Sequence, residues 1–348
     1  MKSFYWEASK EDDGLGIRFE DSYPVQDDIR EGESGQGYVL RMARANFLTG
    51  LVEVRRRLGK NFSTTLTVED AAILSKWFGC QLEELKPMLE KSVKAETDGL
   101  FDDMDASHYA GQHVPKLNYL NRIWPRVCPE CLAENGHCRA TWDFSFITAC
   151  PKHECLLVDQ CAACMKGISW QRPAVDICIC GTYLNDTALY PRQQASNLDL
   201  EVAHWMSQWI DGASIQKTSI GSELPLLELI RPLSFQGGMN ILWVLSLAEE
   251  TKTLKNSSVI DGQMLERCRK TLLKANEFSS KLAVNDLEKF RSKKRQTLIP
   301  TLALCMNESY TYEDRSLAQS LISTILRASG KQSKPIGGVP VQQSLFAE

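Results

Sequence analysis

The residues most capable of chemistry lie between Cys128 and Cys180, where the chain places nine of its twelve cysteines. Seven of these cysteines and one histidine form four short pairs, and each pair can offer two ligand atoms from one tight turn. A structural zinc site takes four Cys or His ligands in a closed tetrahedron. We therefore expect two Zn²⁺ ions, one held by Cys128, Cys131, Cys150 and His153 and the other by Cys161, Cys164, Cys178 and Cys180.

Both predicted sites are structural, because each can fill all four positions, whereas a catalytic zinc keeps one open for water. We expect no catalytic residue, and zinc binding should contribute on the order of 10 kcal/mol per site to folding. The alternative, buried apolar cysteines, is disfavoured by four paired turns in one short segment. The other cysteines and one neighbouring histidine are expected to pack in the interior: Cys80, Cys138, Cys155, Cys268, Cys305 and His137.

The composition is that of an ordinary globular protein. Hydrophobic residues make up 43% and charged residues 24% of the 348 residues, and no run approaches the roughly 20 apolar residues of a membrane-spanning helix. A net charge of -4 and a pI near 5.9 argue against coating nucleic acid by bulk electrostatics and favour a partner that is or contains protein. The N-terminus lacks the apolar core of a signal peptide. We therefore expect a cytoplasmic protein, and in a reducing compartment closely spaced cysteines indicate metal ligands rather than disulfides.

Two stretches of the sequence resemble one known family. Residues 126–136 contain the first cysteine pair. Residues 148–164, which follow Trp142, contain the next two pairs. Upstream, a Glu-Ser pair at residues 33–34 precedes Gly-Tyr and a helix that carries Arg and Asn. Together they resemble the opening motif and zinc segment of the TniQ/TnsD family of transposon target-selection proteins, over roughly residues 22–185. The family usually has prolines near the opening motif, where this chain has only Pro24.

The resemblance implies a non-enzymatic adaptor. Such proteins recognise a target, directly or through a partner, and recruit an AAA+ ATPase that loads the transposase. Short members associate with an RNA-guided Cascade complex, often as a head-to-tail dimer, and longer ones bind DNA themselves. The length, the acidic pI and the weak recognition-helix signal favour an adaptor between Cascade, with its crRNA, and the AAA+ regulator TnsC. The alternatives are a DNA-binding selector of the TnsD type and a zinc-dependent DNA-binding regulator without a transposition role.

The elements around the cysteines predict a mostly α protein with a small α+β zinc-binding region. We expect an acidic extended lead-in over 1–34, a helical domain with a helix-turn-helix-like pair over 35–120, and tandem zinc motifs over 121–190. A C-terminal all-α domain should occupy 191–330, and a disordered tail 331–348. Aromatic and β-branched residues over 138–148 predict a short strand or hairpin between the first two pairs.

The N-terminal helices are predicted from apolar spacing. Ser34 is a candidate N-cap, and apolar residues from Leu40 to Val54 recur at helical spacing up to an arginine cluster. A capping-box pattern over 67–70 begins another helix, which Gly79 should end. The next helix begins with acidic residues, so we favour packing or protein contact over DNA reading for this pair. The aspartates at 102, 103 and 105 are expected to form a solvated loop rather than a two-metal catalytic site.

Two basic clusters are candidate contacts for a partner or for nucleic acid. The first, at the end of the predicted N-terminal helix, also suits the helix dipole. The second, within residues 289–295, is explained in the first place as a solvated helix end and in the second as a contact with nucleic acid or an acidic partner. These candidates are Arg55, Arg56, Arg57, Arg291, Lys293, Lys294 and Arg295.

Overall fold

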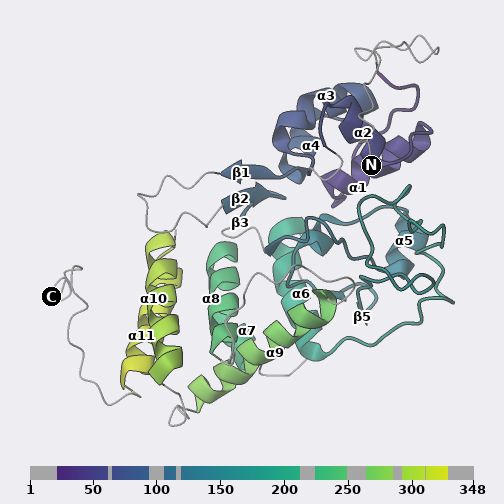
Figure 1. Ribbon diagram of the computed structural model, residues 1–348. Coiled ribbons are helices and arrows are strands. Elements are labelled where there is room, and N and C mark those ends of the chain that lie inside the picture. The colour runs from purple at the N-terminus through teal and green to yellow at the C-terminus, as the bar shows by residue number, and fades with distance from the viewer. Residues whose placement is uncertain are drawn as a thin grey trace, which may run out of the picture.

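Helices dominate the computed structural model, which describes residues 22–61, 65–93, 106–114, 119–211, 224–248, 264–284, 292–309 and 311–327. Figure 1 shows the N-terminal helices at one end, the loop-rich middle segment beside them, and the C-terminal helices on the other side. The predicted fold class, mostly α with a small metal-ligand region, is confirmed. Residues 1–21, the acidic loop at 102–105, Arg291 and the predicted tail lie outside the described residues.

The N-terminal part begins with α1 (Gly35–Ala45) and α2 (Leu51–Arg57). It continues with the 3-10 turn η1 (Val68–Asp70), α3 (Ala71–Phe78), α4 (Leu82–Leu85) and the 3-10 turn η2 (Lys86–Met88). Ser34 caps α1 as predicted, since its Oγ accepts a hydrogen bond from the Gly37 N–H at 3.0 Å. The predicted capping box is present at Thr67 and Asp70, and α3 ends at Gly79 with a φ of 85°.

The single helix predicted from Leu40 to the arginine cluster is wrong, because the chain breaks after α1. The Asn46 side chain accepts a hydrogen bond from Val25 N–H at 2.9 Å and donates one to Val25 C=O at 2.8 Å. These contacts with a segment 21 residues upstream fix Asn46 at the end of α1, and Phe47 follows with a φ of 60°. Phe47, placed by periodicity on the apolar face, is 93% exposed.

A small antiparallel sheet interrupts the segment predicted to be helical. Its strands are β1 (Lys91–Val93), β2 (Ala106–Tyr109) and β3 (Gln112–Val114), in that order. His108 and His113 face each other across β2 and β3, with ring centroids 4.9 Å apart. Since β3 packs against a C-terminal helix, the sheet connects the two helical parts of the molecule.

The middle segment contains α5 (Pro129–Asn135), the 3-10 turn η4 (Ala140–Asp143), β4 (Ala149–Cys150) and β5 (Cys155–Leu156). The strand expected over 138–148 is therefore a 3-10 turn followed by loop, and the hairpin starts one residue later. Burial explains the difference. Trp142, Phe144 and Ile147 are all inserted into the core from irregular backbone, so their apolar character reports burial and not strand pairing.

The C-terminal part is helical, as predicted. It consists of α6 (Asn197–Asp211), α7 (Pro225–Ile230), α8 (Phe235–Leu247), α9 (Met264–Ala283), α10 (Ser292–Glu308) and α11 (Tyr312–Arg327). Helix α8 packs against α9, α10 and β3. None of the described helices is both long and apolar enough to cross a membrane.

One hydrophobic core joins all three parts, since a continuous cluster of buried side chains extends from Tyr23 to Ile325. The N-terminal and middle segments are also tied by backbone. Ser34 N–H donates to Cys138 C=O at 2.8 Å, and Ala140 N–H donates to Gly32 C=O at 2.8 Å. The Glu-Ser motif of the sequence therefore holds α1 against the segment that carries the cysteines.

Candidate metal centres

The first predicted ligand group, which we call the inner quartet, consists of Cys128, Cys131, Cys150 and His153. Cys128 precedes α5 and Cys131 lies in its first turn, while Cys150 ends β4 and His153 lies in the turn before β5. The α5 N-terminus and the β4–β5 hairpin thus bring the two pairs together. One ligand atom from each of the four residues lies within 4.8 Å of all the others, and all four residues are buried.

The inner quartet fits a tetrahedral ion. With ordinary Zn–S and Zn–N bonds, sulfur atoms should be about 3.8 Å apart and sulfur–nitrogen pairs about 3.6 Å. Cys131 Sγ lies 3.6 Å from Cys150 Sγ, and His153 Nδ1 lies 3.4, 3.2 and 3.6 Å from the sulfurs of Cys128, Cys131 and Cys150. The histidine would therefore be a ligand through Nδ1.

A carboxylate behind the histidine sets this orientation. Glu134 Oε1 lies 3.0 Å from His153 Nε2, and Glu134 also forms an ion pair with Lys152 at 2.5 Å. A metal-bound histidine commonly donates its other N–H to a carboxylate, which fixes the ring and its tautomer. Burial lowers the pKa of His153, but the hydrogen bond to Glu134 outweighs this effect and raises the pKa to about 9. Metal binding at Nδ1 must therefore displace a proton.

One sulfur of the inner quartet, that of Cys128, loses its proton more readily than an isolated thiol, while the pKa values of Cys131 and Cys150 are raised by their hydrogen bonds within the group. Hydrogen bonds from Cys131 and Cys150 lower the pKa of Cys128 to about 7. One thiolate in the group is thus available near neutrality, and thiolate is the form that binds metal. Cys155 lies 3.9 Å from Cys128 but outside the quartet.

The second ligand group, the outer quartet, consists of Cys161, Cys164, Cys178 and Cys180. Cys161 and Cys180 sulfurs are 3.7 Å apart, and those of Cys164 and Cys178 are 3.9 Å apart, again close to tetrahedral spacing. Gly181 has a φ of 89°, which allows the chain to turn sharply after the last pair. Unlike the inner group, this one reaches the surface, since Cys164 is partly buried and Cys180 is exposed.

Tyr190 supports the outer quartet from a separate loop. Its hydroxyl donates to Cys161 Sγ at 3.6 Å and accepts from the Ala162 N–H at 3.2 Å. Burial raises the pKa of Cys161, but hydrogen bonds from backbone N–H groups and from the Tyr190 hydroxyl outweigh this effect and lower the pKa to about 6. Each quartet therefore contains one thiol that ionises near or below neutral pH.

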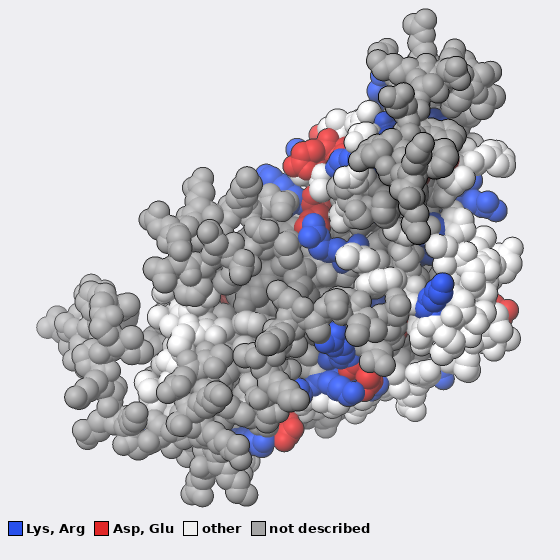
Figure 2. Space-filling view, viewed as in Figure 1, with Lys and Arg blue, Asp and Glu red and all other residues white. Residues whose placement is uncertain are grey.

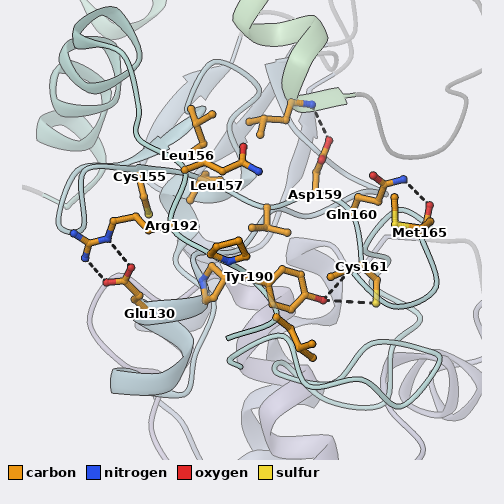
Figure 3. Close-up of a pocket in the computed structure, with 17 residues that line it drawn as sticks. Glu130, Cys155, Leu156, Leu157, Asp159, Gln160, Cys161, Met165, Tyr190 and Arg192 are labelled. Atoms are coloured by element: carbon orange, nitrogen blue, oxygen red, sulfur yellow. Dashed lines mark hydrogen bonds and ion pairs between the residues drawn. The ribbon is translucent and has the colours of Figure 1, made fainter. Parts of the chain in front are cut away.

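A cavity of about 250 Å³ lies between the two quartets. Cys155, beside the inner quartet, and Cys161, of the outer one, both line it, as Figure 3 shows. Arg192 closes one rim through a two-pronged ion pair with Glu130, at 2.8 and 2.5 Å. At another rim, Asp159 accepts the Leu265 N–H at 2.8 Å and so joins the start of α9 to the segment between the quartets.

The sequence predicted the four pairs that the structure brings together in two groups, but not the residues that support those groups. Glu130 and Glu134 are four residues apart on α5, so a helical reading of the segment after Cys128 would have put both on one face. No spacing signal connects Tyr190 or Arg192 to the cysteines, because their loop returns to the site only in the folded chain. Cys138, expected to pack, is buried and accepts a hydrogen bond from Arg172 at 3.2 Å.

The first basic cluster is not one surface. Arg55 is 4% exposed and donates to Gln36 Oε1 at 3.0 Å. Arg57 pairs with Glu53 at 2.7 Å and covers the ring of Tyr23. Arg56 alone of the three is exposed. On the face shown in Figure 2, the described basic side chains lie scattered among acidic and uncharged ones.

The second basic cluster is only partly described. Lys293, Lys294 and Arg295 lie in the first turn of α10, and the structure describes their backbone alone. Contact of this cluster with a partner stays a prediction.

Comparison with known protein families gives a match to the N-terminal part of the chain. The family model TniQ matches residues 24–157, which contain the Glu-Ser motif, α1 to α5 and the whole inner quartet. The outer quartet and the C-terminal helices lie beyond the match. No curated protein matches the chain.

Proposed function

Since the chain belongs to the TniQ family through residues 24–157, we propose that it is a non-enzymatic adaptor that links an RNA-guided Cascade complex to the AAA+ regulator TnsC. Membership of the family indicates a role in selecting the target of transposition. The family match is the observation that carries the proposal. The proposal also includes these two partners, a head-to-tail homodimer and a cytoplasmic location.

The proposal includes two structural zinc ions. The inner quartet would hold one ion through three sulfurs and His153 Nδ1, and the outer quartet would hold the other through four sulfurs. Donor type and spacing support zinc at both. Each ion, when bound, supplies cross-linking of chain segments. The chain's own groups orient the ligands, through Glu134 on His153 and Tyr190 on Cys161.

The shared core and the Ser34–Cys138 backbone contact support an adaptor with one rigid body. A protein that couples two partners needs a fixed distance between its contact surfaces. Metal cross-links in the middle of the chain give that rigidity without relying on core volume alone.

Co-purification tests the proposal. The tagged protein should retain the surveillance complex when that complex carries its crRNA and should recruit TnsC to it. A complex without guide RNA provides the control. Tight, sequence-specific binding of the isolated protein to one DNA site would contradict the adaptor role and favour direct selection of the TnsD type. Genes for a transposase and an ATPase next to the gene of this protein would support the adaptor or the direct selector. Their absence would favour a regulator without a transposition role.

Zinc analysis tests the metal assignment separately. The purified protein should contain two zinc ions per chain, and absorption spectra of a cobalt-substituted sample should show thiolate-rich tetrahedral sites. An ion with an exchangeable water ligand would contradict the structural assignment.

A further inference from the structure

The turn after α1 contains Phe47 at a position where glycine would suit the backbone better. Leu48 N–H donates to Ala43 C=O at 2.9 Å, and Phe47 N–H donates to Arg44 C=O at 3.1 Å. This pair of hydrogen bonds is the Schellman helix ending, whose left-handed position is usually glycine. Here that position is Phe47, with a φ of 60°.

The same chain uses glycine at two other left-handed helix ends. Helix α3 ends at Gly79 with a φ of 85°, and α5 ends at Gly136 with a φ of 63°. A side chain at such a φ strains the backbone, which glycine avoids. Glycine would thus suit the local fold at position 47 better than phenylalanine does.

Packing does not explain the phenylalanine either. Phe47 is 93% exposed, whereas the next residue, Leu48, is 8% exposed and supplies the apolar contact of the turn. The left-handed backbone at Phe47 is strained, and its exposed ring gains little from burial in return. The stability of the folded chain therefore does not explain the phenylalanine at position 47, and we look for a ligand that it contacts.

The cations around this turn indicate the kind of ligand. Arg44 lies three residues before Phe47 in the last turn of α1, and Arg56 lies on α2, which packs against α1. Both are exposed. Within the part of the chain that the structure describes, neither side chain forms an ion pair or a hydrogen bond. The acid nearest in sequence, Glu53, is already engaged by Arg57 and Thr49.

We propose that Phe47 is a stacking platform for an unpaired base of a nucleic-acid strand, with Arg44 and Arg56 contacting the adjacent phosphates. An exposed aromatic flanked by cations is the arrangement that binds single strands without sequence preference. A protein-docking patch would instead be expected to show contiguous apolar surface. The residues before and after Phe47 in the chain are Asn46, which is polar, and Leu48, which is buried. The inference does not depend on the target-selection role, because it concerns the isolated chain.

Binding by the full-length, metal-loaded protein tests the proposal. Fluorescence anisotropy with labelled, mixed-sequence single strands of RNA and of DNA, and with duplex DNA, distinguishes the sources of the strand. Single strands should bind better than duplex. Phe47→Gly should weaken single-strand binding about tenfold or more and, because it removes left-handed strain, should raise the melting temperature. Phe47→Tyr should retain binding.

A matched control is present in the same chain. Met165 has a φ of 57° and is 61% exposed, so Met165→Gly should also raise the melting temperature but leave binding unchanged. Arg44→Ala and Arg56→Ala should each reduce the slope of log affinity against log salt by about 0.7, whereas Lys166→Ala, at another exposed cation, should not.

Two results would overturn the proposal. One is equal binding of single strands by the unaltered protein and by Phe47→Gly. The other is absence of binding to both RNA and DNA single strands by the unaltered protein, which would assign Phe47 to a protein contact instead. A preference for one of the two strands would support the proposal and identify the source.

Discussion

The two quartets have similar donor atoms but occupy different environments. The inner quartet is buried on all four ligands and lies inside the part of the chain that matches the TniQ family. The outer quartet has an exposed cysteine, Cys180, and exposed apolar neighbours in Met165 and Ile179. Ligand spacing thus predicts where metal binds, whereas burial decides how much of the fold depends on it.

The residues that support the inner quartet also belong to more regular structure than those that support the outer quartet. The inner quartet is held by α5 and the β4–β5 hairpin, and Glu134 orients its histidine. The outer quartet lies in loops and is supported by a phenol from Tyr190. We therefore expect loss of the inner ion to be a global event and loss of the outer ion to be a local one.

Removing an inner ligand should have the largest effect. Cys131→Ser should release the inner ion and cost on the order of 10 kcal/mol, which is comparable to the whole stability of a typical domain. The chain should lose its cooperative thermal transition, followed by circular dichroism. Cys305→Ala, at a buried cysteine outside both quartets, should keep both ions and the transition. A cooperative transition in Cys131→Ser at the normal temperature would remove the distinction between the quartets.

Removing an outer ligand should act locally. Cys180→Ser should lose the outer ion while the main thermal transition stays close to its original temperature, because the exposed ligand carries little of the core. New protease cleavage should appear between residues 161 and 190 and be located by mass spectrometry. If Cys180→Ser unfolds the chain as Cys131→Ser does, the outer quartet is as essential as the inner one.

Weakening the support of the inner histidine should have a smaller effect. Glu134→Gln should lower affinity for the inner ion about 10- to 100-fold, the usual range for losing such a carboxylate partner, measured by competition with a chromophoric chelator. Glu130→Gln is the matched control, since its carboxylate lies 3.8 Å from His153 Nε2 and pairs with Arg192. Equal losses in the two variants would mean that general charge, and not the Glu134 contact, sets the affinity.

The smallest effect concerns pH. Burial raises the pKa of Asp143, between the inner cysteine pairs, from 3.8 to about 7, although the hydrogen bond from Tyr109 and the charge of Arg172 oppose this. A raised folded pKa means that the native state holds the extra proton, so this group's contribution is present at low pH and is lost as pH rises towards and past 7. Between about pH 6 and about pH 8, stability should fall by about 1 kcal/mol.

Asp143→Asn should flatten that dependence, measured by denaturant unfolding at each pH. An unchanged pH profile in this variant would assign the dependence to another group. Asp176→Asn, outside the inner segment, is the comparison, since it makes the same chemical change and leaves Asp143 in place.

Local signals in the sequence predicted much of the structure. The capping box at Thr67, the Ser34 cap and the glycine that ends α3 each depend on hydrogen bonds between near neighbours, so sequence spacing contains them. The C-terminal helices followed from apolar periodicity for the same reason. The sheet β1–β3 was missed because its strands are three or four residues long, too short for a period of two to be recognised.

Long-range contacts accounted for the errors. Periodicity continued α1 through Phe47 to the arginine cluster, but the hydrogen bonds between Asn46 and Val25 end the helix. That break exposes Phe47. The three consecutive arginines lie on different faces of α2, so Arg55 is buried and Arg56 is exposed. A basic run in a sequence therefore did not correspond to a basic surface.

The sequence by itself predicted the ligand pairs, because two Cys or His residues with one or two residues between them can offer two ligand atoms from one turn. It also determined the likeness to the TniQ family, which the same residues carry. Only the tertiary structure decided which quartet is inside the core, that Glu134 and Tyr190 support the ligands, and that Phe47 faces solvent. Those outcomes depend on contacts between residues far apart in the chain, and the energies of such contacts are set by burial, which no local pattern records.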